Sequence, residues 1–308
     1  MELKKVFGTI SLEESEFMEL KQVESGFHHI ELSNELGKVV DGTLLAEYFR
    51  KVQGIDKIDC VTITFTSKLE NVLVIKGFPN LLTLVVKGHN IRSFDGLCYF
   101  KKGIFLWIKT EKNRQRIISE IDKTPITKLD ITYENAEDYG AISKSRTIND
   151  LELKKCPSPV FNKWIDVPLE SLQLTAGNFV ELGDIALVKT LRTLVVERCK
   201  KFERFVGDNS NVTWMLLDGC SKLEIDSIRT CKNVEVLTFF AGKKEYSLSA
   251  FKGLNKLKSL NLIDGKVNID IHNLKEIMPS LEELHVSSLK KEQVLELSQL
   301  NEGVKISR

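Results

Sequence analysis

The chain has 308 residues, of which 44 are basic, 43 are acidic and 42% are hydrophobic. The net charge of +1 argues against nucleic acid or an anionic membrane as a bulk partner. No run of about 18 apolar residues occurs, which excludes a membrane-spanning helix, and the hydrophobic fraction is sufficient for a continuous core.

The first 56 residues predict an α/β region that covers one end of the chain. Residues 5–10 and 27–32 read as strands, and residues 42–52 as a helix with Asp41 as its N-cap. The first twenty residues turn acidic and lack the apolar run of a secretory signal. The six cysteines show no C-x-x-C pair, so a reduced, cytoplasmic protein without structural disulfides is expected.

From residue 55 onward, the pattern apolar-x-x-apolar-x-apolar recurs at intervals of 20 to 24 residues. Apolar residues at every third position, such as Ile91, Phe94 and Leu97, follow the second of these strands and predict tight 3₁₀-like return segments. Self-similarity at this period is typical of a solenoid in which each coil stacks on its neighbours. The middle apolar residues are Val61, Leu84, Leu106, Leu129, Leu151, Leu172, Leu194, Met215, Leu237, Leu260, Leu284 and Val304.

These residues resemble the leucine-rich-repeat family over about residues 55–308, in the short, 22-residue form of internalins and of nuclear phosphatase regulators. The resemblance implies a parallel β-sheet on a concave face, with 3₁₀ or turn segments returning behind it. The family's ninth position is usually Asn, whereas Cys156, Cys199 and Cys220 stand there in three repeats. A small polar side chain can still bond the backbone at that bend. Glu111 and Glu134 cannot be buried there, which predicts loops that bulge at residues 109–115 and 133–139.

The last repeat is followed by a second predicted end region. Residues 290–300 read as a helix whose Val294, Leu295, Leu297 and Leu300 close the last coil, before a final strand at residues 304–306. The predicted domains are therefore an N-terminal capping region at residues 1–56, a solenoid at 57–288 and a C-terminal cap at 289–308.

Alternation along each strand predicts which side chains leave the core. Stacked strands about 4.8 Å apart give a face roughly 55 Å long, on which large aromatic and charged residues stand. We predict that a protein partner contacts twelve of these residues: Phe105, Trp107, Lys109, Lys128, Asp130, Asp150, Glu152, Lys154, Glu197, Trp214, Asp218 and Phe240.

The same residues also have structural interpretations. Trp107 and Trp214 can pack against their sheet neighbours. Nearby lysines can neutralise the carboxylates, and the functional alternative is that a basic surface of the partner does so. Asp130, Asp150 and Glu152 offer oxygen ligands, but no loop wraps an ion there, so no metal is expected. No catalytic motif or dinucleotide fingerprint is found, and Cys60 and Cys98 have no activating neighbours, so neither an enzyme nor a cofactor is expected.

The sequence therefore predicts a non-enzymatic recognition scaffold that binds a dedicated protein on its concave face, as a monomer or in a 1:1 complex. A cytosolic inhibitor, such as a toxin-immunity protein, fits this pattern. The alternative is an adaptor or sensor for a peptide or glycan. Both rest on analogy at the level of the fold.

Overall fold

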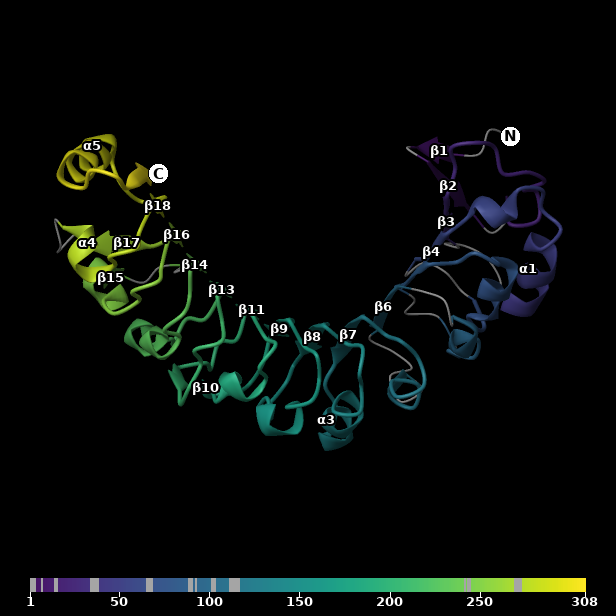
Figure 1. Cartoon of the computed structure of the whole chain (residues 1–308), viewed down its shortest axis with the longest axis horizontal. Coiled ribbons are helices and arrows are strands. Elements are labelled where there is room, and N and C mark those ends of the chain that lie inside the picture. The colour runs from purple at the N-terminus through teal and green to yellow at the C-terminus, as the bar shows by residue number, and fades with distance from the viewer. Residues whose placement is uncertain are drawn as a thin grey trace. The chain divides into compact units, whose positions relative to one another are not determined.

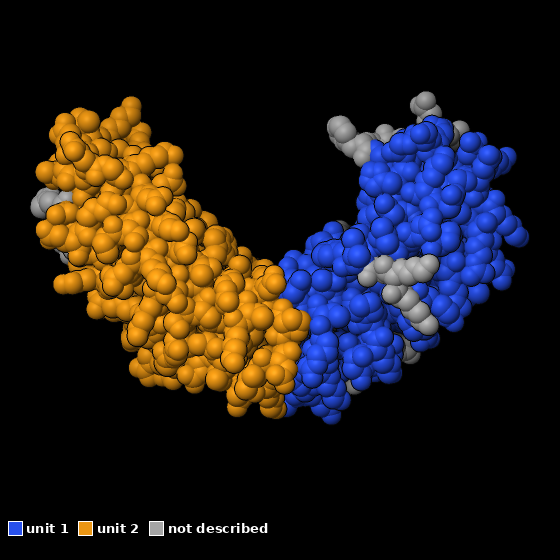
Figure 2. Space-filling model, viewed as in Figure 1, with its two compact units in different colours: residues 1–150 blue, residues 151–308 orange. Residues whose placement is uncertain are grey.

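The computed structural model describes residues 4–6, 8–13, 16–33, 39–64, 69–87, 91, 93–100, 104–110, 117–240, 242, 245–268 and 273–308. The chain has two compact units, residues 1–150 and 151–308 (Figure 2). In each unit, the strands form one side of the structure, and the short helices and 3₁₀ turns form the other (Figure 1). Within each unit, this is the predicted solenoid.

The described residues of unit 1 form seven strands in the order β1-β2-β3-β4-β5-β6-β7. The β1–β2 pair is antiparallel and the other pairs are parallel. The strands are β1 (Lys4–Val6), β2 (Thr9–Leu12), β3 (His29–Leu32), β4 (Cys60–Ile63), β5 (Thr83–Val86), β6 (Phe105–Thr110) and β7 (Lys128–Thr132). The return segments are α1 (Gly42–Phe49), η2 (Ile55–Lys57), η3 (Leu73–Gly77), η4 (Leu97–Tyr99) and α3 (Ala136–Ile142).

Unit 2 continues with β8, which begins at the last residue of unit 1, in the order β8-β9-β11-β13-β14-β16-β18-β19. These strands are β8 (Asp150–Lys154), β9 (Ser171–Thr175), β11 (Thr193–Glu197), β13 (Trp214–Asp218), β14 (Val236–Phe240), β16 (Ser259–Ile263), β18 (Glu283–Val286) and β19 (Lys305–Ser307). Two small parallel pairs lie apart from this sheet: β10 (Glu181–Gly183) with β12 (Arg204–Val206), and β15 (Glu245–Ser247) with β17 (Lys266–Asn268).

The remaining elements of unit 2 are its return segments. They are η5 (Phe161–Lys163), η6 (Ile185–Leu187), η7 (Ile225–Thr230), η8 (Leu248–Phe251), α4 (Leu274–Ile277) and α5 (Lys291–Leu300). The 3₁₀ turns predicted from the three-residue spacing are confirmed in both units. Among the described residues, no helix combines the length and the apolar character that crossing a membrane requires.

The strands alternate as predicted, because one row of side chains enters the core while the next row leaves it. In β11, Leu194 and Val196 are 0% exposed, whereas Thr193, Val195 and Glu197 are partly exposed. Leu194 lies between Leu172 and Met215 of the neighbouring strands, and both of these are also fully buried. This stacked row forms part of the core of unit 2.

A bend after the strand lets several coils of unit 2 bond to the next coil. Ala176 and Arg198 adopt a left-handed conformation, with φ of 53° and 55°, and glycine takes the equivalent place at Gly219 with φ of 63°. The Ala176 amide donates to the Glu197 carbonyl at 2.8 Å, and the Arg198 amide donates to the Asp218 carbonyl at 2.7 Å. Non-glycine residues tolerate this conformation only where surrounding contacts fix it.

Cysteine occupies the ninth position of the repeat in the manner predicted. The Gly177 amide donates to Cys199 Sγ at 3.2 Å, and Cys199 Sγ lies 3.5 Å from the Leu174 carbonyl oxygen. Burial raises the pKa of the Cys199 thiol to about 11, so the thiol stays protonated at neutral pH and can donate to that oxygen. Cys220 makes the same kind of contact with the Val196 carbonyl at 3.6 Å.

The N-terminal region differs from the prediction in its strand pattern. In place of one strand at residues 5–10, β1 and β2 form an antiparallel pair. β2 and β3 then pair in parallel with one another, and β3 pairs in parallel with β4, so that Ile10, Ile30 and Val61 lie in one row. The predicted N-cap is confirmed, because Asp41 accepts a hydrogen bond from the Thr43 amide at 2.8 Å. The helix it caps ends at Phe49.

Two register predictions are wrong. Leu129 lies opposite Ile108 rather than Leu106, because the six-residue strand β6 pairs with β5 through its first four residues and with β7 through its last four. At the C-terminus, Ile306 rather than Val304 lies beside Leu284. Both shifts are of two residues, so the faces of the strands are preserved while the lateral neighbours change.

The predicted loop at residues 133–139 is also wrong, because helix α3 begins there. Asn135 caps it by accepting from the Glu137 amide at 2.9 Å, and the buried Asp138 accepts from the Glu134 and Asn135 amides at 2.8 and 3.3 Å. This capping box satisfies the amides at the helix start. Glu134 is not buried, as predicted. The predicted bulge at residues 109–115 falls largely outside the described residues.

The C-terminal helix covers less apolar surface than predicted. Leu297 of α5 is 2% exposed, but Leu295 and Leu300 are 62% and 53% exposed. Asn301, at the end of α5, is 3% exposed. Its side chain accepts from the Leu274 amide at 2.7 Å and donates to the Leu297 carbonyl at 2.9 Å. A buried polar side chain therefore ties α5 to α4.

We expect Asn209→Ala to destabilise the protein by about 3 kcal/mol. Asn209 is 0% exposed; it accepts from the Ile185 amide at 3.3 Å and donates to the Val206 carbonyl and to Thr230 Oγ1, both at 2.9 Å. The substitution leaves buried polar groups without partners, at about 1–3 kcal/mol for each. Urea unfolding measures the loss. Asn178→Ala, at an exposed position, is the control. An equal loss of stability in this control would contradict the assignment of the loss to the buried hydrogen bonds of Asn209.

Candidate functional site

Two groups of side chains stand on the outward side of the sheet, one in each unit. The Trp107 cluster of unit 1 consists of Lys87, Trp107, Lys109, Lys128, Asp130 and Asp150. The Trp214 face of unit 2 consists of Val195, Trp214, Leu216, Val236, Phe240 and Ile263. Alternation places all of these residues opposite the core, as predicted for the members that were expected to bind a partner.

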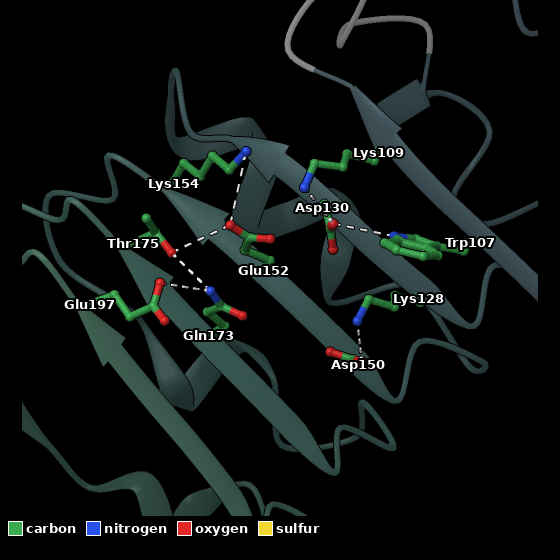
Figure 3. Close-up of polar contacts among 10 residues, drawn as sticks. All are labelled: Trp107, Lys109, Lys128, Asp130, Asp150, Glu152, Lys154, Gln173, Thr175 and Glu197. Carbon is green, nitrogen blue, oxygen red and sulfur yellow. Dashed lines mark hydrogen bonds and ion pairs between the residues drawn. The ribbon is translucent and has the colours of Figure 1, made fainter. Parts of the chain in front are cut away.

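The register shift between β6 and β7 arranges the Trp107 cluster. Trp107 lies between Val85 and Lys128, and Lys109 lies beside Asp130. Trp107 Nε1 donates to Asp130 Oδ2 at 3.2 Å across the diagonal, and Lys109 Nζ lies 3.6 Å from the same oxygen (Figure 3). The Asp130 side chain is only 2% exposed. This carboxylate is therefore engaged within the protein.

Cations also cover the Trp107 ring. Lys87 Nζ lies 4.6 Å from the ring centroid, and Lys128 Nζ lies 4.9 Å from it. Both distances are within the range of a cation–π contact. Lys128 Nζ also forms an ion pair with Asp150 Oδ2 at 2.8 Å. The Trp107 side chain thus has polar and cationic partners in its own unit.

We expect Trp107→Phe to lower the free energy of unfolding by about 1–3 kcal/mol. Phenylalanine keeps an aromatic ring for the two lysines but removes the N–H that bonds the buried Asp130 carboxylate, and losing such a donor has this cost. Trp214→Phe should change stability by less than about 0.5 kcal/mol. Urea unfolding measures the stability of both variants. Equal losses of stability would contradict the conclusion that, of the two indole N–H groups, only that of Trp107 is bonded to a described residue.

In unit 2, the charges on β8 are also paired locally. Glu152 Oε1 lies 3.9 Å from Lys154 Nζ and accepts from Thr175 Oγ1 at 3.4 Å (Figure 3). The Glu152 side chain is 14% exposed and the Lys154 side chain is 20% exposed. Local lysines therefore neutralise Asp130 and Asp150 in unit 1 and Glu152 in unit 2, which agrees with the structural interpretation of these charges. In the described parts of the chain, no group of three or more His, Cys, Asp or Glu side chains could hold a metal ion.

The Trp214 face gathers apolar side chains from neighbouring strands of unit 2. Trp214 lies beside Val236, and Leu216 lies beside Val195 on one side and Thr238 on the other. Phe240 lies beside Ile263 of the next strand. All of these side chains are partly exposed. Apolar side chains that remain partly exposed to solvent on a sheet face are typical of an interaction surface.

Trp214 differs from Trp107 in its surroundings. Among the residues that the structure describes, none forms a hydrogen bond, ring contact or cation–π contact with the Trp214 side chain. Its indole N–H therefore has no hydrogen-bond partner among the described residues. Tryptophan in such a position is enriched among the residues that dominate protein–protein binding.

An acidic pair borders the Trp214 face. Glu197 and Asp218 lie directly opposite one another on β11 and β13. Glu197 Oε2 accepts from Gln173 Nε2 at 3.1 Å (Figure 3), but neither carboxylate forms an ion pair with any described residue. The side chain of Arg192, which lies one residue before β11, donates to the Lys189 and Leu191 carbonyls at 2.7 and 2.9 Å. Adjacent like charges on a sheet cost stability.

The remaining predicted residue, Phe105, lies on the outward side of β6 beside Thr83 and is partly exposed. Lys87 and Gln173 were not among the predicted site residues, although each contacts one that was. Alternation already places both on the outward face. Burial raises the pKa of the Cys60 thiol to about 11, which makes an activated thiol at this position unfavourable.

No family model matches the chain, and no curated protein matches it. Solved structures do. TLR13 in its complex with ssRNA13 is 14% identical with a TM-score of 0.64, and the match covers 97% of this chain and 47% of that one. A chain of the Toll–Spatzle complex from Drosophila is 10% identical with a TM-score of 0.51, with coverages of 92% and 40%.

The Listeria monocytogenes internalin InlF is 13% identical with a TM-score of 0.44, and the match covers 98% of this chain and 86% of that one. The chain thus spans about half the length, or less, of the TLR13 and Toll-complex chains that it matches. At these identities, the likenesses to the TLR13 and Toll-complex chains establish the fold alone.

Proposed function

Because this chain has the leucine-rich-repeat fold, we propose that it is a recognition scaffold whose protein partner docks on the outward side of the sheet. The Trp214 face is the centre of this docking surface. In unit 1, the Trp107 indole is not part of this centre, because it is already bonded to Asp130. The proposed role is binding without catalysis.

One observation carries the proposal: a tryptophan without a described partner stands among apolar side chains beside two carboxylates that form no ion pair with a described residue. Both features have a cost in the isolated protein, since apolar surface is left in water and like charges face each other. A partner that covers these apolar side chains and neutralises the charges removes both costs. Binding hot spots combine a central aromatic residue with such surrounding contacts.

We further propose that the partner is a single dedicated protein and that the complex inhibits it, as a cytoplasmic immunity protein does with its toxin. The outward face supports this role because its residue types differ from one strand to the next. β13 presents Trp214, Leu216 and Asp218, whereas the adjacent β14 presents Val236, Thr238 and Phe240. Such a mosaic complements one particular surface better than it complements a repetitive ligand.

Affinity capture from a lysate of the source cells tests this function, with captured proteins identified by mass spectrometry. The variants are Trp214→Ala and, as a matched control, Leu187→Ala, which truncates an exposed residue of η6 on the other side of unit 2. We expect one protein to be retained by the wild type and by Leu187→Ala but lost by Trp214→Ala. Retention by all three would place the partner elsewhere on the chain.

A further inference from the structure

Three side chains form a row at one edge of the Trp214 face. Glu197, Asp218 and Phe240 occupy matched positions on the adjacent strands β11, β13 and β14. We propose that this row binds an arginine side chain of the protein partner, while the partner's apolar residues cover Trp214. This inference rests on the proposed function and specifies the chemistry of the partner at that surface.

Neither carboxylate of the row forms an ion pair with a described residue. On β8 of the same unit, Glu152 has Lys154 at 3.9 Å. Glu197 has only the neutral Gln173 amide, and the Asp218 carboxylate has no described partner. Two carboxylates on neighbouring strands about 4.8 Å apart therefore keep their negative potential at the edge of the Trp214 face. A positively charged side chain is the complementary group.

The residue types favour arginine over lysine. The guanidinium group is planar and carries five N–H donors, so it can bond to two neighbouring carboxylates at once. Its flat face also stacks on an aromatic ring, and Phe240 lies beside Asp218 in the register. The Phe240 ring has no ring or cation–π partner among the described residues. An ammonium group satisfies the charge but neither the bidentate geometry nor the stacking.

The distance between Trp214 and Asp218 along β13 determines where the partner's apolar group must lie relative to its arginine. Trp214 and Asp218 are four residues apart on β13, which corresponds to about 13 Å along the strand. The intervening Leu216 lies on the same outward face. The partner segment therefore presents an arginine about 13 Å from the apolar side chain that covers Trp214.

Peptide display on the whole chain tests the inference and does not require the partner to be identified first. A library of random peptides is selected on the immobilised wild-type chain and then counter-screened on Trp214→Ala. Arginine should be enriched among the Trp214-dependent peptides relative to the starting library. In a selected peptide, replacing this arginine by citrulline should weaken binding at least tenfold, and replacing it by lysine should weaken binding to a smaller extent.

The double variant Glu197→Gln/Asp218→Asn should weaken the same peptides at least tenfold, and it should not weaken the citrulline peptide further. Its melting temperature should stay equal or rise, because it removes like-charge repulsion. The control Glu170→Gln/Glu282→Gln removes the same charge from exposed residues just before β9 and β18 and should bind normally.

Trp214-dependent peptides that lack arginine and ignore the double variant would overturn the arginine site and leave the proposed function standing. A selection that yields no Trp214-dependent peptide would contradict the proposed function itself.

Discussion

Leu194→Ala should lower the free energy of unfolding by about 2–5 kcal/mol, the range measured for large-to-small substitutions in packed cores. Leu194 is fully buried between Leu172 and Met215, which are also fully buried. Strand pairing fixes Leu172 and Met215 on both sides of Leu194, so we expect the truncation to leave a cavity. Urea unfolding followed by circular dichroism gives the difference.

The matched control for this prediction is the next residue in the same strand. Val195→Ala removes two methyl groups from the partly exposed face of β11 and should cost less than about 1 kcal/mol. A larger loss for Val195→Ala than for Leu194→Ala would mean that the two faces of β11 are interchanged. The whole assignment of the outward surface would then be wrong.

Trp214→Ala should weaken partner binding by about 2 kcal/mol or more, which is roughly 30-fold in Kd. The indole has no described partner within the protein, so its truncation removes contacts made in the complex and little else. Stability should change by less than about 1 kcal/mol. Calorimetric titration with the captured partner, together with urea unfolding of the free variant, separates the two effects.

Trp107→Ala provides the comparison. Because its indole bonds the buried Asp130 carboxylate, this variant should lose more stability and less affinity than Trp214→Ala. If Trp107→Ala and Trp214→Ala lost equal affinity, Trp107 would contribute as much to binding as Trp214 does. A loss of affinity in Trp107→Ala alone would contradict the assignment of Trp214.

The repeat pattern predicts most of the fold, because alternation and period are local properties of the sequence. Leu172, Leu194 and Leu260 lie in the core row as expected, and Cys199 bonds the backbone at the bend. The register between two strands is not a local property, because it also depends on the neighbouring strand. β6 is long enough to pair with its two neighbours at different offsets, and nothing in its own residues specifies the slip.

Helix α3 shows a second limit of the repeat pattern. Glu134 at the ninth position correctly predicts a departure from the pattern, but the departure is a capped helix rather than a bulging loop. The signal for the helix is Asn135 followed three residues later by Asp138, which together form a capping box. This local motif lies outside the repeat consensus, so the consensus alone does not predict it.

For the candidate site, the sequence predicts which side chains face outward but not which of them are already engaged. Trp107 and Trp214 occupy outward positions on their strands, yet only Trp107 has a carboxylate within reach of its N–H among the described residues. That contact runs diagonally from β6 to Asp130 of β7. Such contacts depend on register and rotamer together, so one strand's pattern does not determine them.

The central claim is that a protein partner covers the Trp214 face, and site-specific photo-crosslinking in the source cells tests it most directly. A photoreactive phenylalanine analogue replaces Thr238, which lies beside Leu216 on the outward face, and in a control replaces Leu187 on the other side of unit 2. We expect one discrete protein adduct from position 238 and none of that protein from position 187. No adduct at 238, or the same adduct from 187 alone, would contradict the claim.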